Sequence, residues 1–281
     1  MIFMHEGKYL LGFALLILVL LASPSGVESS GQTADNSLLE EFSRAESGVI
    51  ESGELLYINQ GKKLGNESYQ IMKTETGGLR LEAEGVVTPP IPIPFVKPKI
   101  KFSQNIEVDR YLKPESLFLQ YKGPLGIGSK KINATIAAGE IELKRGKDRK
   151  KLKLPEGENV FVGTTSSQAL FALILATREE IELFTEIRSG GSGPPGQNEE
   201  RVLVEVRLES TSETELNPSG APGPVKRYVF VEPENGRRKE IFVRDGTFLV
   251  YRASSEEGSF YVFRSDLLGK DFRFKGQDEV S

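Results

Sequence analysis

The sequence has no cysteine and no tryptophan, and its single histidine is His5. Without imidazole or thiol groups beyond that residue, the chain cannot build the Ser-His-Asp or Cys-His machinery of nucleophilic hydrolases. It also lacks the side chains that bind zinc, copper or haem in most proteins. Because no disulfide can cross-link the chain, its stability must come from a buried core. We therefore expect no cofactor, and any catalysis would depend on carboxylate, lysine, tyrosine or calcium chemistry.

The sequence also lacks a strong excess of charge of one sign. It contains 36 Lys and Arg residues against 40 Asp and Glu residues, which gives a formal net charge of -4. Proteins that bind nucleic acid normally show a basic surface, so we expect no nucleic-acid partner. With 281 residues the chain is long enough to bury one large core or two small ones.

A long apolar run, Tyr9–Ala22, follows Lys8 near the start of the chain. As a helix, a run of this length spans about 21 Å, which is short of the roughly 30 Å hydrocarbon core of a membrane. The length predicts a signal peptide over residues 1–25 and an exported protein, periplasmic or extracellular. Pro24 makes the cleavage site a poor one, so the run could instead remain as an uncleaved membrane tether.

The remaining sequence divides into three parts. Residues 26–52 are polar and predict a tether, with a short helix at Leu38–Ala45 behind an S-x-x-E capping box. Residues 53–268 carry the pattern of a single β-rich domain. Residues 269–281 are expected to form a polar tail.

Hydrophobic residues between positions 53 and 268 alternate with a period of two, and turn-forming residues interrupt them at short intervals. This pattern predicts a mainly β fold, an antiparallel meander that forms a curved sheet or an open half-barrel. The predicted strands are Glu54–Asn59, Glu67–Thr74, Leu79–Val87, Ile100–Asp109, Ser116–Lys122, Lys131–Ala137, Ile141–Lys144, Lys151–Leu154, Asn159–Val162, Ile181–Arg188, Val202–Glu209, Tyr228–Val231, Glu240–Val243, Thr247–Arg252 and Phe260–Arg264.

Two dipeptides, Asn235-Gly236 and Asp245-Gly246, favour tight hairpins because their residues accept positive φ. Two longer segments, Ser189–Gln197 and Asn217–Pro224, are rich in glycine and proline. We interpret both as long hairpin connections inside one domain, since the strand pattern continues on either side. The alternative is that they link separate domains.

One segment, Ser166–Thr177, departs from the β pattern. It is apolar without interruption from Ala169 to Ala176, and Thr165 or Ser166 could cap its start. A core strand is possible, but alanine and leucine dominate the run and β-branched residues are few. We therefore predict a helix that is buried on all sides in the concave face of the sheet.

Several short patterns in the β-rich part carry a resemblance to known proteins: Leu56-Tyr57-Ile58, Gly61, Leu64-Gly65, Tyr69–Met72 and Arg237–Arg252. With these patterns the chain resembles the periplasmic lipoprotein-carrier type of half-barrel. It more closely resembles an uncharacterised family of exported bacterial domains that is usually grouped near those carriers. The resemblance implies an unclosed barrel that holds an apolar ligand, such as an acyl chain, between sheet and helix, and it implies no catalytic residues.

A proline-rich segment, Thr88–Pro98, has no counterpart in that family. Its prolines hold it extended, so it could act as a lid, a membrane-touching finger or a partner dock. The alternative is a crossover that closes one end of the barrel. Taking this segment and the buried helix together, the residues expected to contact an apolar ligand are Leu170, Phe171, Leu173, Ile174, Ile91, Ile93 and Phe95.

Basic residues cluster in the segment Lys144–Lys153, around a Gly-Lys-Asp turn. On the tip of a hairpin they could contact anionic lipid headgroups, with each cation contributing about 1 kcal/mol. The residues expected to do so are Lys147, Arg149, Lys150 and Lys151. A solvated hairpin tip without any partner is the alternative.

These features predict a non-enzymatic protein of the cell envelope that binds an apolar or lipid-like ligand inside a half-barrel. A structural or protein-interaction module of the envelope is the alternative, with an envelope protein as its partner. A second alternative is a carboxylate-dependent enzyme that acts on glycans, which would need two opposed carboxylates in a cleft.

Overall fold

The computed structural model describes residues 48–88, 99–123, 129–155, 159–177, 181–188, 203–216, 223–255 and 258–273. The predicted signal peptide and the predicted helix Leu38–Ala45 lie outside these residues. Within them, no helix is both long enough and apolar enough to cross a membrane.

The described strands form one sheet of 15 strands. Two helices accompany them, α2 (Ser167–Thr177) between β9 and β10 and the short α3 (Ser265–Leu268) after β15. The strands are β1 (Val49–Asn59), β2 (Lys62–Lys73), β3 (Leu79–Val87), β4 (Ile100–Val108), β5 (Pro114–Lys122), β6 (Lys130–Ala137), β7 (Glu140–Arg145), β8 (Asp148–Lys153), β9 (Asn159–Val162), β10 (Leu183–Ile187), β11 (Leu203–Glu215), β12 (Pro224–Val231), β13 (Arg238–Arg244), β14 (Thr247–Ser255) and β15 (Gly258–Arg264).

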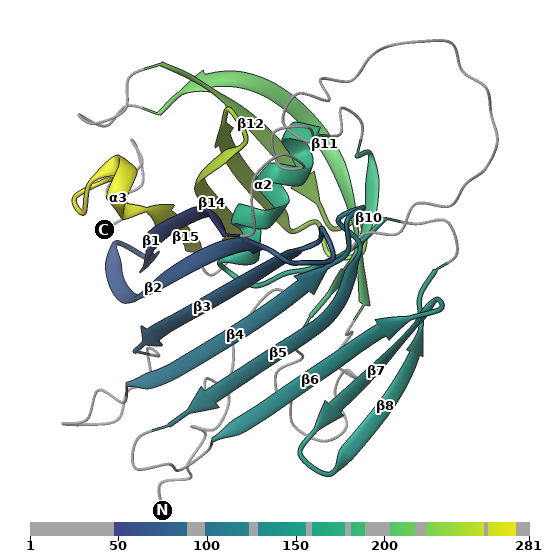
Figure 1. Cartoon of the computed structure of the whole chain (residues 1–281). Helices are drawn as coiled ribbons and strands as arrows, with labels where there is room; N and C mark the ends of the chain where they lie inside the picture. Colours follow the sequence, from purple (N-terminus) through teal and green to yellow (C-terminus); the bar gives the residue numbers. More distant parts are fainter. Residues whose placement is uncertain are drawn as a thin grey trace, which may run out of the picture.

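The order of the strands in the sheet is β8-β7-β6-β5-β4-β3-β2-β1-β15-β14-β13-β12-β11-β10-β9. The first and last of the described strands, β1 and β15, therefore pair near the middle of the sheet, and the consecutive strands β8 and β9 lie at its two edges. Neighbouring strands are antiparallel except β9 and β10, which are parallel and are joined through α2. The predicted mainly β fold, a meander forming a curved open sheet with one buried helix, is confirmed (Figure 1).

The two predicted hairpin dipeptides behave differently. Asp245 and Gly246 both have positive φ, 48° and 76°, and join β13 to β14 in the tight turn that was predicted. Gly236 also has positive φ, but it lies in a longer connection between β12 and β13. Within that connection the side chain of Glu232 is buried and accepts a 2.8 Å hydrogen bond from Asn235 Nδ2.

Two hydrophobic clusters lie on opposite faces of the sheet. The larger one fills the concave face, where α2 packs against β13 and β14 inside the curve of the sheet (Figure 1). The smaller one covers the outer face of β1 and β13 to β15, and it includes Leu268 of α3 and Phe272. The middle of the sheet is therefore buried on both faces, whereas the β6–β8 end lies away from the helix.

Two domain boundaries differ from those expected. Strand β1 begins at Val49, inside the predicted tether 26–52, because the long strand β2 continues to pair with it as far as Met72. At the other end, Phe272 of the predicted polar tail is buried in the outer cluster. On both sides of the two glycine- and proline-rich loops, β10 pairs with β11 and β11 with β12, so these strands belong to one sheet.

Candidate functional site

Helix α2 begins with a pair of reciprocal hydrogen bonds. Thr164 Oγ1 accepts a 3.1 Å bond from the N–H of Ser167, and Ser167 Oγ accepts a 2.6 Å bond from the N–H of Thr164. Hydroxyl groups in this position satisfy backbone donors that the first turn of a helix leaves free. Thr164 therefore caps the helix, rather than the predicted Thr165 or Ser166, whose hydroxyls bond elsewhere.

The four helix residues that were predicted to contact a ligand are Leu170, Phe171, Leu173 and Ile174, and all four are buried. Such a helix is held by packing on every side rather than by one apolar stripe. Whether these residues contact a ligand stays a prediction. The other three predicted contacts, Ile91, Ile93 and Phe95, lie outside the described residues.

Phe171 belongs to an aromatic cluster with Phe161 of β9, Phe184 of β10 and Phe230 of β12. Its ring centroid lies 3.9 Å from that of Phe161, in an edge-to-face arrangement, and 5.5 Å and 5.6 Å from the centroids of Phe184 and Phe230. Edge-to-face contacts of this kind add to the stabilisation that burial alone provides. The centre of α2 is thus fixed to three strands of the concave face.

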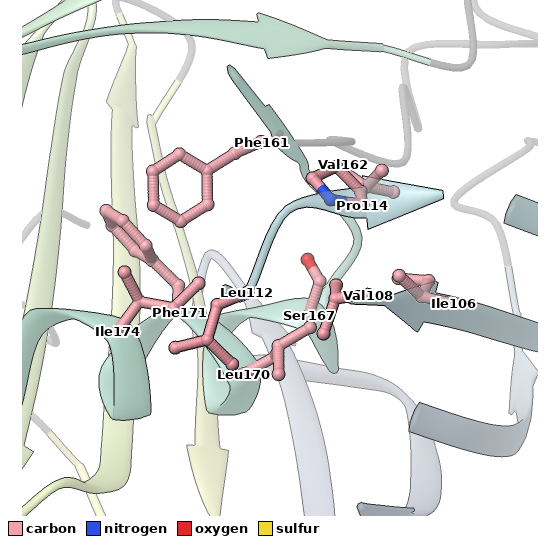
Figure 2. Close-up of a pocket in the computed structure, with 10 residues that line it drawn as sticks. All are labelled: Ile106, Val108, Leu112, Pro114, Phe161, Val162, Ser167, Leu170, Phe171 and Ile174. Carbon is pink, nitrogen blue, oxygen red and sulfur yellow. The ribbon is translucent and has the colours of Figure 1, made fainter. Parts of the chain in front are cut away.

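A small apolar pocket lies beside this cluster (Figure 2). Its volume is about 10 Å³, which is close to the minimum that holds one water molecule. The only hydroxyl in its lining, on Ser167, donates to the carbonyl of Thr164, so the surface offered to a guest is apolar. The lining residues come from α2, β9 and the β4–β5 hairpin: Ile106, Val108, Leu112, Pro114, Phe161, Val162, Ser167, Leu170, Phe171 and Ile174.

Leu112 reaches the pocket from a strained turn between β4 and β5. Its φ is 59°, in the left-handed region, where a residue other than glycine is disfavoured by about 1–2 kcal/mol. Asp109 Oδ1 stabilises the turn by accepting 2.8 Å hydrogen bonds from the N–H groups of Tyr111 and Lys113. One wall of the pocket therefore consists of a short turn that stores backbone strain.

The predicted cationic hairpin is formed by β7 and β8. Lys150 pairs with Leu143, a core residue of the concave face, whereas Arg149 pairs with Lys144 and Lys151 with Glu142. Because cross-strand partners share a face of the sheet, Lys150 lies on the face opposite to Arg149 and Lys151.

Acidic side chains lie among these cations. Arg149 is 4.0 Å from Glu142, and Lys151 is 4.0 Å from Glu140. Lys147 is exposed in the turn that joins the strands. The structure thus brings Arg149 and Lys151 together on one face, in contact with carboxylates, and contact with an anionic surface stays a prediction.

A buried polar group, which we call the Glu67 cluster, surrounds the start of α2. It consists of Tyr57, Glu67, Gln104, Thr165 and Ser166. The Glu67 carboxylate accepts hydrogen bonds from the Tyr57 hydroxyl, from Thr165 Oγ1 at 2.8 Å and from Gln104 Nε2 at 2.9 Å. The Gln104 amide also bonds to Ser166 Oγ. Polar contacts therefore join the start of the helix to β1, β2 and β4.

Small residues on β3 allow the Glu67 cluster to form. Glu67 is in register with Gly85, and Gln104 is in register with Ala83, so the two polar side chains meet diagonally across the intervening strand. A Cβ atom on Gly85 would lie 2.5 Å from the ring of Phe102 and 2.7 Å from a backbone oxygen. A larger residue at position 85 would therefore push against Phe102 on β4 and the backbone of β2, next to Glu67.

Burial raises the pKa of the Glu67 carboxyl above its usual range, although the hydrogen bonds from Tyr57 and its other partners oppose the shift.

The alternation of β2 marks Glu67 as a buried residue, which the sequence-based prediction of the site missed. Glu67 is in phase with Tyr69 and Ile71 along β2, on the face that alternation assigns to the core. Gln104 is likewise in phase with Phe102 and Ile106 on β4, on the buried face of that strand.

A second group, the buried ion network, consists of Glu186, Arg188, Glu232 and Lys239. Lys239 forms ion pairs with the carboxylates of both Glu186 and Glu232. Arg188 also pairs with both, and its Nη2 atom lies 2.8 Å from Oε2 of Glu186. Burial alone would raise the pKa of Glu232, but Lys239 and Arg188 outweigh it and lower that pKa to about 2. Sequence reasoning missed this network as well, although Glu186 is in phase with the core residue Phe184.

In the part of the chain that the structure describes, no group of three or more His, Cys, Asp or Glu residues is arranged to hold a metal ion. The carboxylates of the two buried groups instead contact hydroxyl, amide and cationic side chains, and of their oxygen atoms only Oε1 of Glu186 has no hydrogen-bond partner among the described residues. The apolar pocket is a different kind of candidate, because its lining offers a guest molecule hydrophobic contacts.

No protein-family model and no curated protein matches the chain in sequence. Among solved structures, it is similar to the beta-barrel-like protein of domain of unknown function DUF1849 from Brucella abortus, with 10% sequence identity and a TM-score of 0.45. The match covers 77% of this chain and 94% of that chain. The likeness of this chain to lipoprotein carriers and to a family of exported bacterial domains stays a prediction.

Proposed function

We propose that this chain is a non-enzymatic binding protein that takes an apolar, lipid-like ligand between α2 and the β4–β5 hairpin. The observation that carries the proposal is the apolar pocket, whose one hydroxyl is engaged by the backbone (Figure 2). Sites for apolar ligands are lined mainly by hydrophobic and aromatic side chains and have volumes of about 300–1,000 Å³, so this pocket, at about 10 Å³, would be the starting point of such a site.

The pocket is too small for an acyl chain without movement of its walls. The turn that carries Leu112 is the wall that we expect to move, because its displacement releases backbone strain. The opposite wall, formed by α2 and the aromatic cluster, is fixed by packing from several strands. We therefore expect the ligand to enter by displacing Leu112.

Mass spectrometry of lipids retained by the purified protein, together with thermal shifts on adding acyl ligands, tests the proposal. Val108→Phe places a ring in the pocket and should abolish the thermal shift. Val87→Phe is the matched control, because Val87 belongs to the same concave core but does not line the pocket. A protein that retains no lipid and shows no shift with any acyl ligand would overturn the proposal.

A structural or interaction module of the envelope is the second candidate. The aromatic cluster favours it, since a filled core is what a scaffold requires. Its binding element would be the segment Thr88–Pro98 or the β7–β8 hairpin. Deleting residues 89–97 should then abolish binding to an envelope protein and leave the melting temperature nearly unchanged.

A glycan-active carboxylate enzyme has less support. Glu186 and Glu232 share the same two cationic partners and are buried, so they are not opposed across an open cleft. A glycosidase needs a carboxyl pair that a sugar can reach. Two results together would restore this alternative: cleavage of a glycan by the unmodified protein, and loss of that cleavage in Glu232→Gln.

We also propose export through residues 1–25, to the periplasm or the outside of the cell. The proposal rests on the apolar run Tyr9–Ala22. The mass of the protein recovered from cells shows whether that segment has been removed. A full-length protein in the membrane fraction would indicate the tethered form, and a full-length protein in the cytosol would overturn export.

A further inference from the structure

The apolar pocket and the Glu67 cluster are neighbours along two elements. On β4, Ile106 lines the pocket, and Gln104 of the cluster is the next residue on the same face. At the start of α2, Ser166 bonds to Gln104 and the following residue, Ser167, lines the pocket. The Glu67 cluster therefore adjoins the pocket along β4 and at the start of α2.

Two buried side-chain amides near the start of α2, those of Gln104 and Gln168, each have an oxygen atom without a hydrogen-bond partner among the described residues. Gln104 is 3% exposed, and its Nε2 atom is used by Glu67 and Ser166. Gln168, on the first turn of α2, donates from Nε2 to the carbonyl of Thr164. Among the described residues, neither Oε1 atom has a hydrogen-bond partner. Both free atoms accept hydrogen bonds, so the chemical group that completes them is a donor.

The charge of the Glu67 cluster restricts what that donor can be. An anionic headgroup placed beside Gln104 would lie close to the Glu67 carboxylate, in an interior where like charges repel strongly. The positive end of α2, which would otherwise attract an anion, already faces Glu67 through Thr165. A hydroxyl or an amide N–H supplies a hydrogen without bringing a negative charge.

We infer that the ligand is an uncharged amphiphile whose hydroxyl or amide head donates a hydrogen bond to Gln104 Oε1 and whose apolar chain lies along the pocket. This inference rests on the proposed function and specifies the ligand class of that same site. It predicts discrimination between lipids that have the same chain and differ only in the head, because a site built around a hydrogen bond rejects analogues that lack the donor.

Isothermal titration of the full chain with three twelve-carbon probes tests the inference. The probes are dodecanol, which has a donor, methyl dodecanoate, which has none, and dodecanoic acid at about pH 8, where the free acid is ionised. We expect dodecanol to bind about tenfold more tightly than the ester, which corresponds to one hydrogen bond. The ionised acid should bind most weakly of the three.

Two substitutions assign the preference to the cluster. Gln104→Leu should make dodecanol and the ester bind with equal affinity. The matched control is Gln120→Leu, because Gln120 lies on β5 out of phase with its core residues, and this variant should keep the preference for dodecanol over the ester. Glu67→Gln should raise the affinity for the ionised acid about tenfold and leave dodecanol nearly unchanged. The second substitution preserves the size of the side chain, so it remains informative if Gln104→Leu unfolds the protein.

The outcomes separate the inference from the proposed function. If dodecanol and the ester bind the unmodified protein with equal affinity, the inference is overturned and the apolar-ligand function stands. If none of the three probes binds, both are overturned. A preference for dodecanol that survives Gln104→Leu would assign the head to another part of the barrel and would also overturn the inference.

Discussion

Gln104 on β4 donates a 2.9 Å hydrogen bond to Glu67 on β2, across the intervening strand β3. Glu67 in turn accepts from Thr165, immediately before α2. The position of the helix over the sheet is therefore set by directional polar contacts as well as by hydrophobic packing. Hydrophobic contacts alone would tolerate sliding of an all-apolar helix, whereas a buried carboxylate with several donors has few satisfactory positions.

Replacing Glu67 by Gln should make the protein less sensitive to rising pH. Burial raises the pKa of Glu67 above its usual value of about 4.5. For a carboxyl whose folded-state pKa is raised, stability is fully present below the unfolded-state pKa and is lost as the pH rises through the folded-state value. The free energy of unfolding of Glu67→Gln, relative to the original protein, should therefore increase as the pH rises above about 4.5.

Urea unfolding at several pH values checks this expectation. Glu115→Gln is the matched control, because Glu115 is an exposed carboxyl on β5. A constant difference between Glu67→Gln and the original protein over the whole pH range would show that Glu67 titrates alike in the folded and unfolded states.

Gly85→Ala should destabilise the protein by about 2 kcal/mol, as expected for overpacking of a tight core. The added Cβ would lie 2.5 Å from the Phe102 ring and 2.7 Å from the backbone oxygen of Asn66, which cannot move aside easily. Gly139→Ala provides the comparison. That position has open space but a φ of 76°, so we expect a cost of only about 1 kcal/mol from backbone strain. Equal costs in urea unfolding would contradict the steric explanation.

Alternation and turn residues predicted each of the fifteen strands near its observed place, and the composition of Ser166–Thr177 predicted the buried helix. These features are local, because period two and the scarcity of β-branched residues act within one segment. The pairing of β1 with β15 could not be predicted in this way, since it depends on how the whole sheet curves. Residues at the two ends of the domain carry no local mark of that contact.

The candidate site residues also fall into two groups, those that local sequence predicts and those that only the tertiary fold brings together. Leu170, Phe171 and Ile174 were identified from the sequence because an apolar helix must be buried, and all three line the pocket. Glu67 and Gln104 were missed because each is a single polar residue in the apolar phase of a strand. Alternation shows that such a residue faces the core, but it does not show which residue forms a hydrogen bond with it. Only the tertiary fold brings their strands and the start of α2 together.

Phe171→Ala should destabilise the protein by about 3–5 kcal/mol, the usual cost of removing a large buried aromatic ring. The ring packs against three other phenylalanines and fixes the centre of α2. Tyr111→Ala is the control, because Tyr111 is 56% exposed on the β4–β5 turn and its removal should cost well under 1 kcal/mol. Similar melting temperatures for the two variants would mean that the concave face can repack around a missing ring.

Glu232→Gln should lower the free energy of unfolding at neutral pH by about 3 kcal/mol, because it leaves Arg188 and Lys239 with one carboxylate between them. The pKa of Glu232 is lowered to about 2 from about 4.5. For a carboxyl with a depressed pKa, the stabilisation is present above the unfolded-state pKa and is lost as the pH falls through the folded-state value. The difference between the variant and the original protein should therefore shrink below about pH 4.5 and vanish near about pH 2.

Guanidinium chloride would screen the ion pairs, so urea is the appropriate denaturant for this measurement. Glu205→Gln is the control, since Glu205 forms an exposed pair with Arg207 that should contribute less than about 1 kcal/mol at any pH. If Glu232→Gln cost as little as the control at neutral pH, the buried ion network would stabilise the fold no more than a surface ion pair does. Its desolvation penalty would then equal the attraction between its charges, and the network would be maintained for a reason other than stability.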